Sequence, residues 1–389
     1  MLEINEQDCV VDIVDNILSE AIIKSSSDVH LESMENYLRV RYRIDGILYD
    51  QSPESFQLSN QILSRIKVLS NIDIAQRRIP QDGKWQYNYN NNAIDLRVST
   101  FPSVYGEKIV IRILDRLKTK IVLENLGFED QIYNKFKDLI NKAHGFLLVT
   151  GPTGSGKTTT LYAALTQIHK PEKNIITLED PVEYHIDGIT QGQINLGANF
   201  TFSKGIRALL RQDPDIVMVG EIRDRESAKI AIEASLTGHL VFSTLHTNDA
   251  SSAIMRLMDM DIEPFLINAA LTGVLAQRLV RKICNNCRFE YQPRADEIKL
   301  IKFFNFDLKR LFKGKGCTQC SLTGHKGRIG IFELLIMTDE LRSLIIKNPK
   351  FQEIKHQAVN DGMQTLVQDA FKKIENGLIT IEEFLRVIL

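Results

Sequence analysis

Residues 151–158 carry the first pattern that points to chemistry, GPTGSGKT, which matches G-x-x-x-x-G-K-[ST] in full. The apolar run GFLLVT precedes it, so we expect a strand, a loop and a helix, the context in which this pattern binds phosphate. Glycines let backbone N–H groups curl around phosphate oxygens, while Lys157 reaches the β and γ phosphates and Thr158 ligates magnesium. The alternative is a chance glycine-rich turn. The residues expected to bind ATP are Gly151, Pro152, Thr153, Gly154, Ser155, Gly156, Lys157, Thr158 and Thr159.

Three carboxylates follow a second apolar run in the segment LEDPVEY, at Glu179, Asp180 and Glu183. Parallel strands present ligands at their carboxyl ends, so this loop should lie beside the phosphate loop. A carboxylate that orients or deprotonates water contributes about 10²–10⁴-fold to a reaction rate. The alternative is that Pro181 ends the strand and the acids are solvated or cap a helix. That alternative applies more to Glu179 and Asp180 than to Glu183.

The segment DPDIVMVGEIRD lacks an acid where one is expected. Its residues 216–219 are the apolar run of a buried parallel strand, and in many P-loop ATPases such a strand ends in an aspartate that holds the magnesium shell. Gly220 stands at that place, and Glu221 is the first carboxylate. The sequence therefore requires another acid, or a combination of acids, to replace the aspartate.

Two histidines flank the next apolar run in TGHLVFSTLHTND. His246 follows the run, so it should lie at the same edge of the sheet as the phosphate loop, where it can hydrogen-bond the γ-phosphate or the attacking water. His239 precedes the run and is the weaker candidate. For each histidine the alternative is a structural side chain in the core or in a turn.

Four of the five cysteines form two C-x-x-C pairs. Cys284 and Cys287 are separated from Cys317 and Cys320 by 29 residues, so two thiolate knuckles can converge on one tetrahedral site. Four thiolates with no open position suit structural zinc rather than catalysis. Redox-active or incidental thiols are the alternatives, because the intervening loop is longer than in common zinc ribbons.

The whole chain has the composition of an ordinary globular protein, with 389 residues, 43% hydrophobic and 25% charged. This length predicts two or three domains. The net charge of -1 gives no global field toward nucleic acid or anionic lipid, so we expect no nucleic-acid partner. The start of the chain lacks the pattern of a secretory signal, no apolar run is long enough to span a bilayer, and paired cysteines fit a reducing compartment. We therefore expect a cytoplasmic protein.

Apolar periodicity predicts a helix over 7–24, then short β segments and a helix over 58–71. Farther along, strands alternate with helices, which predicts an α/β fold with a doubly wound parallel sheet. The expected strands are 145–150, 174–179, 215–221 and 239–247. The expected divisions are an N-terminal α+β domain over 1–115, a linker over 116–125, an ATPase core over 126–283, a tetracysteine zinc subdomain over 284–320, and a mostly helical C-terminal segment over 321–389.

Several segments together resemble one family, the bacterial ATPases of type II secretion and type IV pilus assembly. They follow the family's order over nearly all of residues 20–389. The matching segments are SSDVHLES, RYRIDGIL, DIAQRRIPQDGK, DLRVSTFPSVYGEKIVIRIL, GPTGSGKTTTLY, LEDPVEY, LLRQDPDIVMVGEIRD, SLTGHLVFSTLHTN, LAQRLVRKIC and GRIGIFELL. The chain is most similar to the general secretion pathway ATPases, with the pilus extension motors as the alternative. Pilus retraction motors generally lack the paired cysteines.

The resemblance implies a RecA-like P-loop core and assigns roles by position. Glu183 becomes the water-activating base, Glu221 the Walker B acid, and His246 a member of the histidine box. Arg97 and Arg112 match arginines of the preceding domain that reach the phosphates when subunits close, and arginines of this kind are worth about 10³–10⁵ in rate. The family also carries the four cysteines, which strengthens the zinc assignment.

The resemblance further implies a homo-hexameric motor, with ATP, Mg²⁺ and Zn²⁺, that moves an inner-membrane platform protein and assembles a pseudopilus. It would be peripheral to the inner membrane through its partners. Relatives usually carry a further N-terminal domain that docks onto a membrane-anchored protein, whereas this sequence reaches SSDVHLES after 25 residues. The alternatives are docking through such a domain onto a membrane-anchored protein and attachment through the zinc subdomain and the platform protein alone. A DNA translocase and a non-catalytic zinc scaffold are the competing functions.

Arg207 and Arg211 are four residues apart, so they share a helix face. They contact either a neighbouring subunit or surface acids, and the sequence favours neither.

Overall fold

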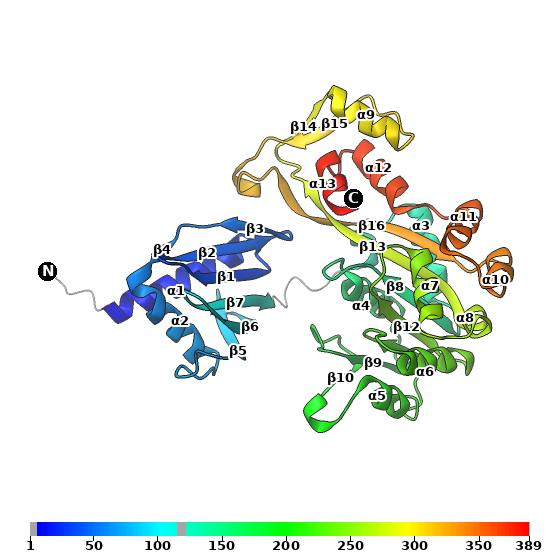
Figure 1. The fold of residues 1–389 in the computed structure, drawn as a ribbon, viewed down its shortest axis with the longest axis horizontal. Helices are drawn as coiled ribbons and strands as arrows, with labels where there is room; N and C mark the ends of the chain where they lie inside the picture. Colours follow the sequence, from blue (N-terminus) through cyan, green and yellow to red (C-terminus); the bar gives the residue numbers. More distant parts are fainter. Residues whose placement is uncertain (1–5, 115–121, 389) are drawn as a thin grey trace. The chain divides into compact units, whose positions relative to one another are not determined.

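The structure, a computed structural model, describes residues 6–114 and 122–388 (Figure 1). The chain forms two compact units, with the boundary between residues 119 and 120, and each unit has its own hydrophobic core. Residues 116–121 of the expected linker lie outside the described residues. Within the described parts, no helix is both long and apolar enough to cross a membrane.

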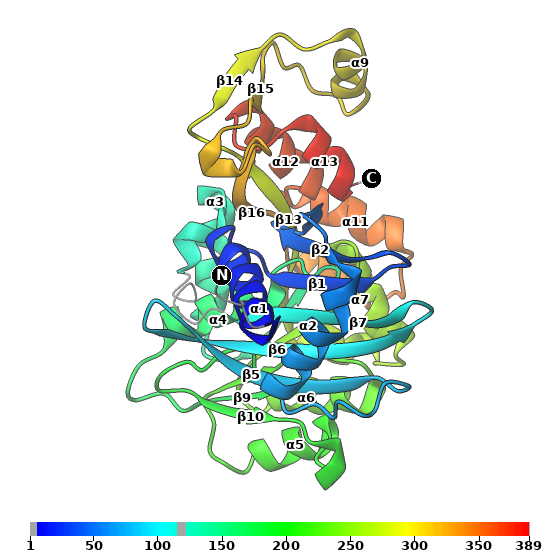
Figure 2. The same ribbon diagram turned by 90° about the vertical axis from the view of Figure 1, so that its left-hand side faces the viewer.

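The first unit is an antiparallel sheet covered by two helices on one face. Its strands follow the order β3-β2-β1-β7-β6-β5, with β4 paired to β2. They are β1 (Asp28–Ser33), β2 (Tyr37–Ile44), β3 (Ile47–Asp50), β4 (Glu54–Ser55), β5 (Gln81–Tyr89), β6 (Asn92–Ser103) and β7 (Gly106–Leu114). Helices α1 (Glu6–Ile23) and α2 (Phe56–Leu69) lie across one face, as Figure 2 shows. The helices expected over 7–24 and 58–71 are thus confirmed.

The second unit is built on a seven-stranded sheet in the order β10-β9-β11-β12-β8-β13-β16. The pairings from β10 to β13 are parallel, and β16 runs antiparallel to β13. The strands are β8 (Gly145–Thr150), β9 (Ile175–Glu179), β10 (Thr190–Gln193), β11 (Ile216–Val219), β12 (Leu240–Leu245), β13 (Leu271–Ile283) and β16 (His325–Ile336). The four strands predicted from apolar runs are β8, β9, β11 and β12, and β8 and β12 lie side by side at the centre of this sheet.

Helices cover both faces of this sheet, which confirms the doubly wound α/β fold (Figure 1). One face is covered by α3 (Asp130–Ile140) and α4 (Lys157–Ile168). The other is covered by α5 (Phe202–Leu209), α6 (Arg225–Leu236), α7 (Ala250–Asp259) and α8 (Pro264–Ala270), which α10 (Asp339–Ile345) and α11 (Phe351–Asn360) extend. Small residues such as Ala228 and Ala231 let α6 approach the sheet closely.

An extension with its own core continues from β13 and β16. It holds the hairpin β14 (Arg288–Tyr291) and β15 (Leu311–Gly314), the helix α9 (Ala295–Phe303), and the C-terminal helices α12 (Leu366–Glu375) and α13 (Ile381–Ile388). Phe306 stacks on Phe371, and Phe371 in turn packs edge-on against Phe384. Both views place the hairpin and α9 beside α12 and α13 (Figures 1 and 2).

The start of α13 carries only half of a capping box. Thr380 Oγ1 accepts a hydrogen bond from the Glu383 N–H at 3.2 Å, as that motif requires. The Glu383 carboxylate, however, binds Arg281 and Arg386. In a complete capping box this carboxylate would accept from the backbone N–H of Thr380, but here it binds the charged side chain of Arg281 in β13.

Candidate functional site

The loop between β8 and α4 has a backbone that requires glycine. Gly151, Gly154 and Gly156 have φ values of +150°, +77° and +87°, which L side chains rarely adopt. A Cβ on Gly151 would lie 2.4 Å from the Gln277 carbonyl oxygen and 2.6 Å from Ser155 Oγ. The loop therefore curls as the P-loop pattern predicts, and the sheet packs directly against it.

Lys157, the first residue of α4, has its ammonium group folded over the loop. Its Nζ donates to the carbonyl oxygens of Gly151 at 2.9 Å and Pro152 at 3.0 Å. Burial lowers the pKa of Lys157 to about 8, and the nearby Glu221 carboxylate opposes that shift. Ser155 Oγ is buried and has no hydrogen-bond partner among the described residues. The loop thus holds one cation and one unsatisfied hydroxyl, which fits a phosphate group.

Glu221 and His246 meet beside this loop, at the carboxyl edge of the sheet. His246 Nε2 lies 3.5 Å from Glu221 Oε2, and Arg223 forms ion pairs with Glu221 and, at 3.7 Å, with Asp180. Partial burial and the Lys157 charge lower the pKa of His246, with Glu221 acting in the opposite direction. The structure therefore brings Lys157, Glu221 and His246 into one electrostatic cluster.

Glu179 has a structural environment rather than a catalytic one. Its side chain is buried and accepts hydrogen bonds from Tyr162 Oη, from Thr177 Oγ1 at 2.5 Å and from Gln191 Nε2 at 3.2 Å. Burial raises the pKa of this carboxyl above its usual range. Tyr162 Oη also accepts from the Glu183 N–H at 3.4 Å, so this network fixes the backbone of the loop that carries the exposed Glu183.

Two residues of the LAQRLVR segment also belong to this edge, although the sequence reasoning gave them no role. Gln277 Oε1 accepts a hydrogen bond from Thr160 of α4 at 2.6 Å. Arg278 Nη2 donates to Asn248 Oδ1 at 3.1 Å, and Asn248 lies two residues after His246 in the sequence. The signal available in the sequence was the mainly apolar run around these residues, LTGVLAQRLV, which is consistent with a further buried strand.

Gly220 packs against the neighbouring strand. Its N–H donates to the Leu178 carbonyl oxygen at 2.8 Å, and a Cβ would lie 3.2 Å from that oxygen and 3.3 Å from Glu179 Cα. A larger residue would therefore press on the backbone that leads into the LEDPVEY loop.

Arg97 and Arg112 lie in the first unit, directly opposite each other on β6 and β7. Arg112 Nε is 3.0 Å from Asp28 Oδ1 of β1. Both project from the face that α1 and α2 leave uncovered, because their neighbours Val98 and Ile111 point into the core.

The remaining candidates have local partners. Arg207 Nη1 lies 2.8 Å from Glu226 Oε1, which favours the surface-acid reading for that residue. His239 Nδ1 lies 2.9 Å from the Ala234 carbonyl oxygen at the end of α6. Because His239 precedes β12, it sits at the opposite edge of the sheet from the P-loop and serves as a structural side chain.

The four cysteines of the extension converge. Their sulfur atoms all lie within 4.8 Å of one another, with Cys284–Cys317 and Cys287–Cys320 at 3.8 Å and Cys317–Cys320 at 3.7 Å. A tetrahedron of Zn–S bonds of about 2.3 Å has edges of about 3.8 Å, whereas a disulfide needs about 2.05 Å. The donor set and spacing therefore fit a structural zinc ion.

The chain is similar to known proteins over nearly its whole length. A family model described as type II/IV secretion system protein matches residues 3–386. Type II secretion system protein E of Pseudomonas aeruginosa is 46% identical over 387 residues, which is 100% of this chain and 77% of that protein. Type II secretion system ATPase E of Vibrio cholerae is 45% identical with the same coverage. The type IV pilus assembly ATPase PilB of Thermus thermophilus is 47% identical over 96% of this chain and 42% of its own.

Solved structures share the fold. The ATPase DotB of Legionella pneumophila superposes with a TM-score of 0.71 at 21% identity, covering 96% of this chain and 94% of that one. The pilus retraction motor PilT, solved with ADP, gives a TM-score of 0.62 at 26% identity and covers 95% of each chain. The likeness extends over both units.

Proposed function

The chain belongs to the type II/IV secretion system protein family and is a P-loop ATPase of type II secretion, and from this premise we propose that it hydrolyses ATP to drive pseudopilus assembly through an inner-membrane platform. The observation that carries the proposal is the cluster of Lys157, Glu221 and His246 beside a complete P-loop. Such a cluster can bind a nucleotide triphosphate and respond to its γ-phosphate.

The P-loop amides and Lys157 bind and orient the phosphates, while Thr158 and Glu221 hold the shell of a magnesium ion, which when bound neutralises phosphate charge. Glu183 activates the attacking water, and His246 senses the γ-phosphate through its contact with Glu221. This division of work explains how Gly220 can replace the usual aspartate. Arg97 and Arg112 would supply positive charge to the developing transition state.

A single substitution tests the base. Glu183→Gln should lower the rate of phosphate release by about 10²–10⁴-fold, because the amide cannot accept the proton of water, while ATP binding persists. Asp187→Asn is the matched control, since Asp187 is exposed in the same loop. Unchanged hydrolysis in Glu183→Gln would remove this assignment, and equal losses in both variants would indicate a folding defect.

The alternative function is that of a type IV pilus extension motor, and the 47% identity to PilB supports this alternative. Complementation of a bacterial strain that lacks the gene distinguishes the secretion function from the pilus function. Restoration of an exported enzyme by the wild-type chain, but not by Lys157→Ala, supports secretion. Restoration of surface pili and twitching without any effect on secretion supports the alternative.

We further propose a homo-hexamer in the cytoplasm, held at the inner membrane by its platform partner, with no nucleic-acid partner. The family resemblance supports these assignments, and so do the fit of the P-loop to ATP with Mg²⁺ and of the cysteines to Zn²⁺. Mass photometry with and without a non-hydrolysable ATP analogue measures the assembly. Stimulation of the ATPase by DNA would contradict the absence of a nucleic-acid partner.

A further inference from the structure

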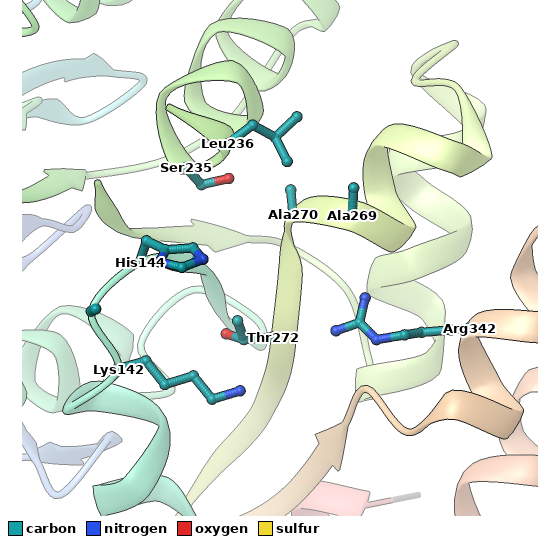
Figure 3. A pocket seen from close by; sticks show the side chains of 10 residues that line it. Lys142, His144, Ser235, Leu236, Ala269, Ala270, Thr272 and Arg342 are labelled. Carbon is teal, nitrogen blue, oxygen red and sulfur yellow. The ribbon is translucent and has the colours of Figure 1, made fainter. Parts of the chain in front are cut away.

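A second pocket lies in the ATPase unit, at the edge of the sheet opposite to the P-loop (Figure 3). It has a volume of about 350 Å³. Lys142 and His144 precede β8, whereas the P-loop follows that strand, so the two sites lie at opposite ends of β8. Nothing in the proposed ATPase cycle uses this pocket.

Three basic side chains converge on the pocket from two sides. In Figure 3, Lys142 and His144 reach in from the loop before β8, and Arg342 reaches in from α10. Arg342 is held in place because it donates to the carbonyl oxygens of Asn268 and, at 3.1 Å, of Leu271. The side chains of Lys142 and His144 are exposed and have no hydrogen bond or ion pair among the described residues. None of the ten described lining residues is acidic.

The other walls add acceptors and apolar surface. Ser235 Oγ donates to the Ile232 carbonyl oxygen at 2.7 Å, and Thr272 Oγ1 donates to that of Phe146 at 3.0 Å. Because each hydroxyl has used its hydrogen, what it offers to a ligand is an acceptor lone pair. Leu236, which is 43% exposed, forms an apolar wall beside them. A ligand that matches these walls carries hydroxyl or amino donors and an apolar surface as well as negative charge.

We propose that this pocket binds a small phosphorylated compound of the nucleoside monophosphate class. A phosphate dianion matches converging lysine, arginine and histidine better than a single carboxylate does. Ribose hydroxyls can donate to Ser235 and Thr272, and a base can lie on Leu236. The volume is at the lower end of the range for small-molecule sites, about 300–1,000 Å³, which favours a monophosphate over a larger ligand.

The pocket is connected to the P-loop through two neighbouring strands. β8 runs from the pocket directly into Gly151, and β13 runs from Thr272 to Gln277, whose carbonyl oxygen packs against Gly151. A ligand that fixes the beginning of both strands therefore acts on the same packed layer that supports the P-loop. Occupancy of the pocket should alter the rate of ATP hydrolysis.

Calorimetric titration of AMP into the full chain tests the proposal. The P-loop is first saturated with a non-hydrolysable ATP analogue and Mg²⁺, so that only a second site responds. We expect one saturable site for AMP, weaker binding of ribose 5-phosphate, and none of adenosine, which lacks the phosphate.

Charge reversal identifies the site. Lys142→Glu and His144→Glu should each weaken AMP binding by about tenfold or more, since each places a carboxylate that repels phosphate among lining residues of which none is acidic. Both side chains are exposed, so folding should be unaffected, and Lys135→Glu on α3 is the matched control. Three results would overturn the proposal: no binding of AMP or ribose 5-phosphate up to about 1 mM, the upper end of ordinary metabolite affinities; unchanged AMP binding in both variants; or binding of a glutamate-rich peptide without binding of the phosphorylated probes.

Discussion

The ion pair between Arg281 and Glu383 links the last helix to the sheet. The loss of stability on its removal can be estimated from the structure. The Glu383 side chain is 2% exposed. Its Oε1 lies 2.6 Å from Arg281 Nη2, its Oε2 accepts from the Arg281 N–H at 2.9 Å, and Arg386 Nη2 lies 2.7 Å away. Burial alone would raise the pKa of Glu383, but the hydrogen bonds from Arg386 and Arg281 hold it at about 2, against an ordinary value of 4.5.

The magnitude follows from linkage between protonation and folding. A difference of about 2.5 pH units corresponds to about 3 kcal/mol, and we reduce this to about 2 kcal/mol because Arg386 is partly solvent-screened. Since the pKa is depressed in the folded state, the stabilisation is complete above pH 4.5 and is lost as pH falls toward 2. Glu383→Gln should therefore lose about 2 kcal/mol at pH 7 and show a flatter pH dependence between about pH 5 and 2.

Hydrogen exchange of α13 peptides is the suitable assay, because a chain of two units does not unfold in one step. The single tryptophan, Trp85, lies in β5 of the first unit, so its fluorescence is an internal control that should not change. Glu382→Gln is the matched control, since Glu382 is 49% exposed and pairs with Lys313. Wild-type pH dependence in Glu383→Gln, or equal effects in both variants, would refute the reasoning.

Three further predictions concern other parts of the second unit. Glu333 accepts from the first N–H groups of two helices, Ala250 of α7 at 2.9 Å and Leu366 of α12 at 3.3 Å. Glu333→Ala should therefore lower the local stability of these helices by about 2–5 kcal/mol and Glu333→Gln by less, as measured by hydrogen exchange of α7 and α12 peptides. Protein purified without chelator should contain about one zinc ion per chain by elemental analysis, and Cys317→Ser should lose most of it together with thermal stability; a zinc content far below one in the wild type would contradict the site. Gly220→Asp should not raise the rate of phosphate release, because its Cβ would press on the Leu178 carbonyl; a faster variant would mean that the aspartate is truly missing.

Much of the second unit could be predicted because its signals are local. The strands around residues 145–150 and 216–219 are continuous apolar runs, and such runs are buried on both faces of a parallel sheet. β10 escaped prediction because its sequence, TQGQ, is polar and lies at the edge of the sheet. The antiparallel β16 also has an apolar run, but its direction depends on pairing with β13 and leaves no local trace.

The residues of the functional site likewise include some that the sequence predicts and some that only the fold brings together. The P-loop lies within eight consecutive residues, so its glycines and Lys157 are visible in the sequence. Gln277 supports that loop from 117 positions after Thr160, a contact that only the folded sheet creates. Buried charged side chains are equally difficult to predict from the sequence. Lys67 is 1% exposed because it binds Glu107, 40 positions away, and nothing in the amphipathic pattern of its helix distinguishes it from a surface lysine.

Strand β13 joins three places that the chain otherwise keeps apart. It begins at the second pocket, passes the P-loop at Gln277 and ends one residue before Cys284. Its 13 residues span about 40 Å, and pairing on both sides stiffens the middle, while the register shifts between Leu271 and Gly273 and between Arg281 and Ile283. In mechanical terms, β13 is a stiff element whose ladder is interrupted near each end, where it can bend. A displacement beside the nucleotide would travel along it as translation and leave it, at the second interruption, as a change in the angle of the cysteine-bearing extension.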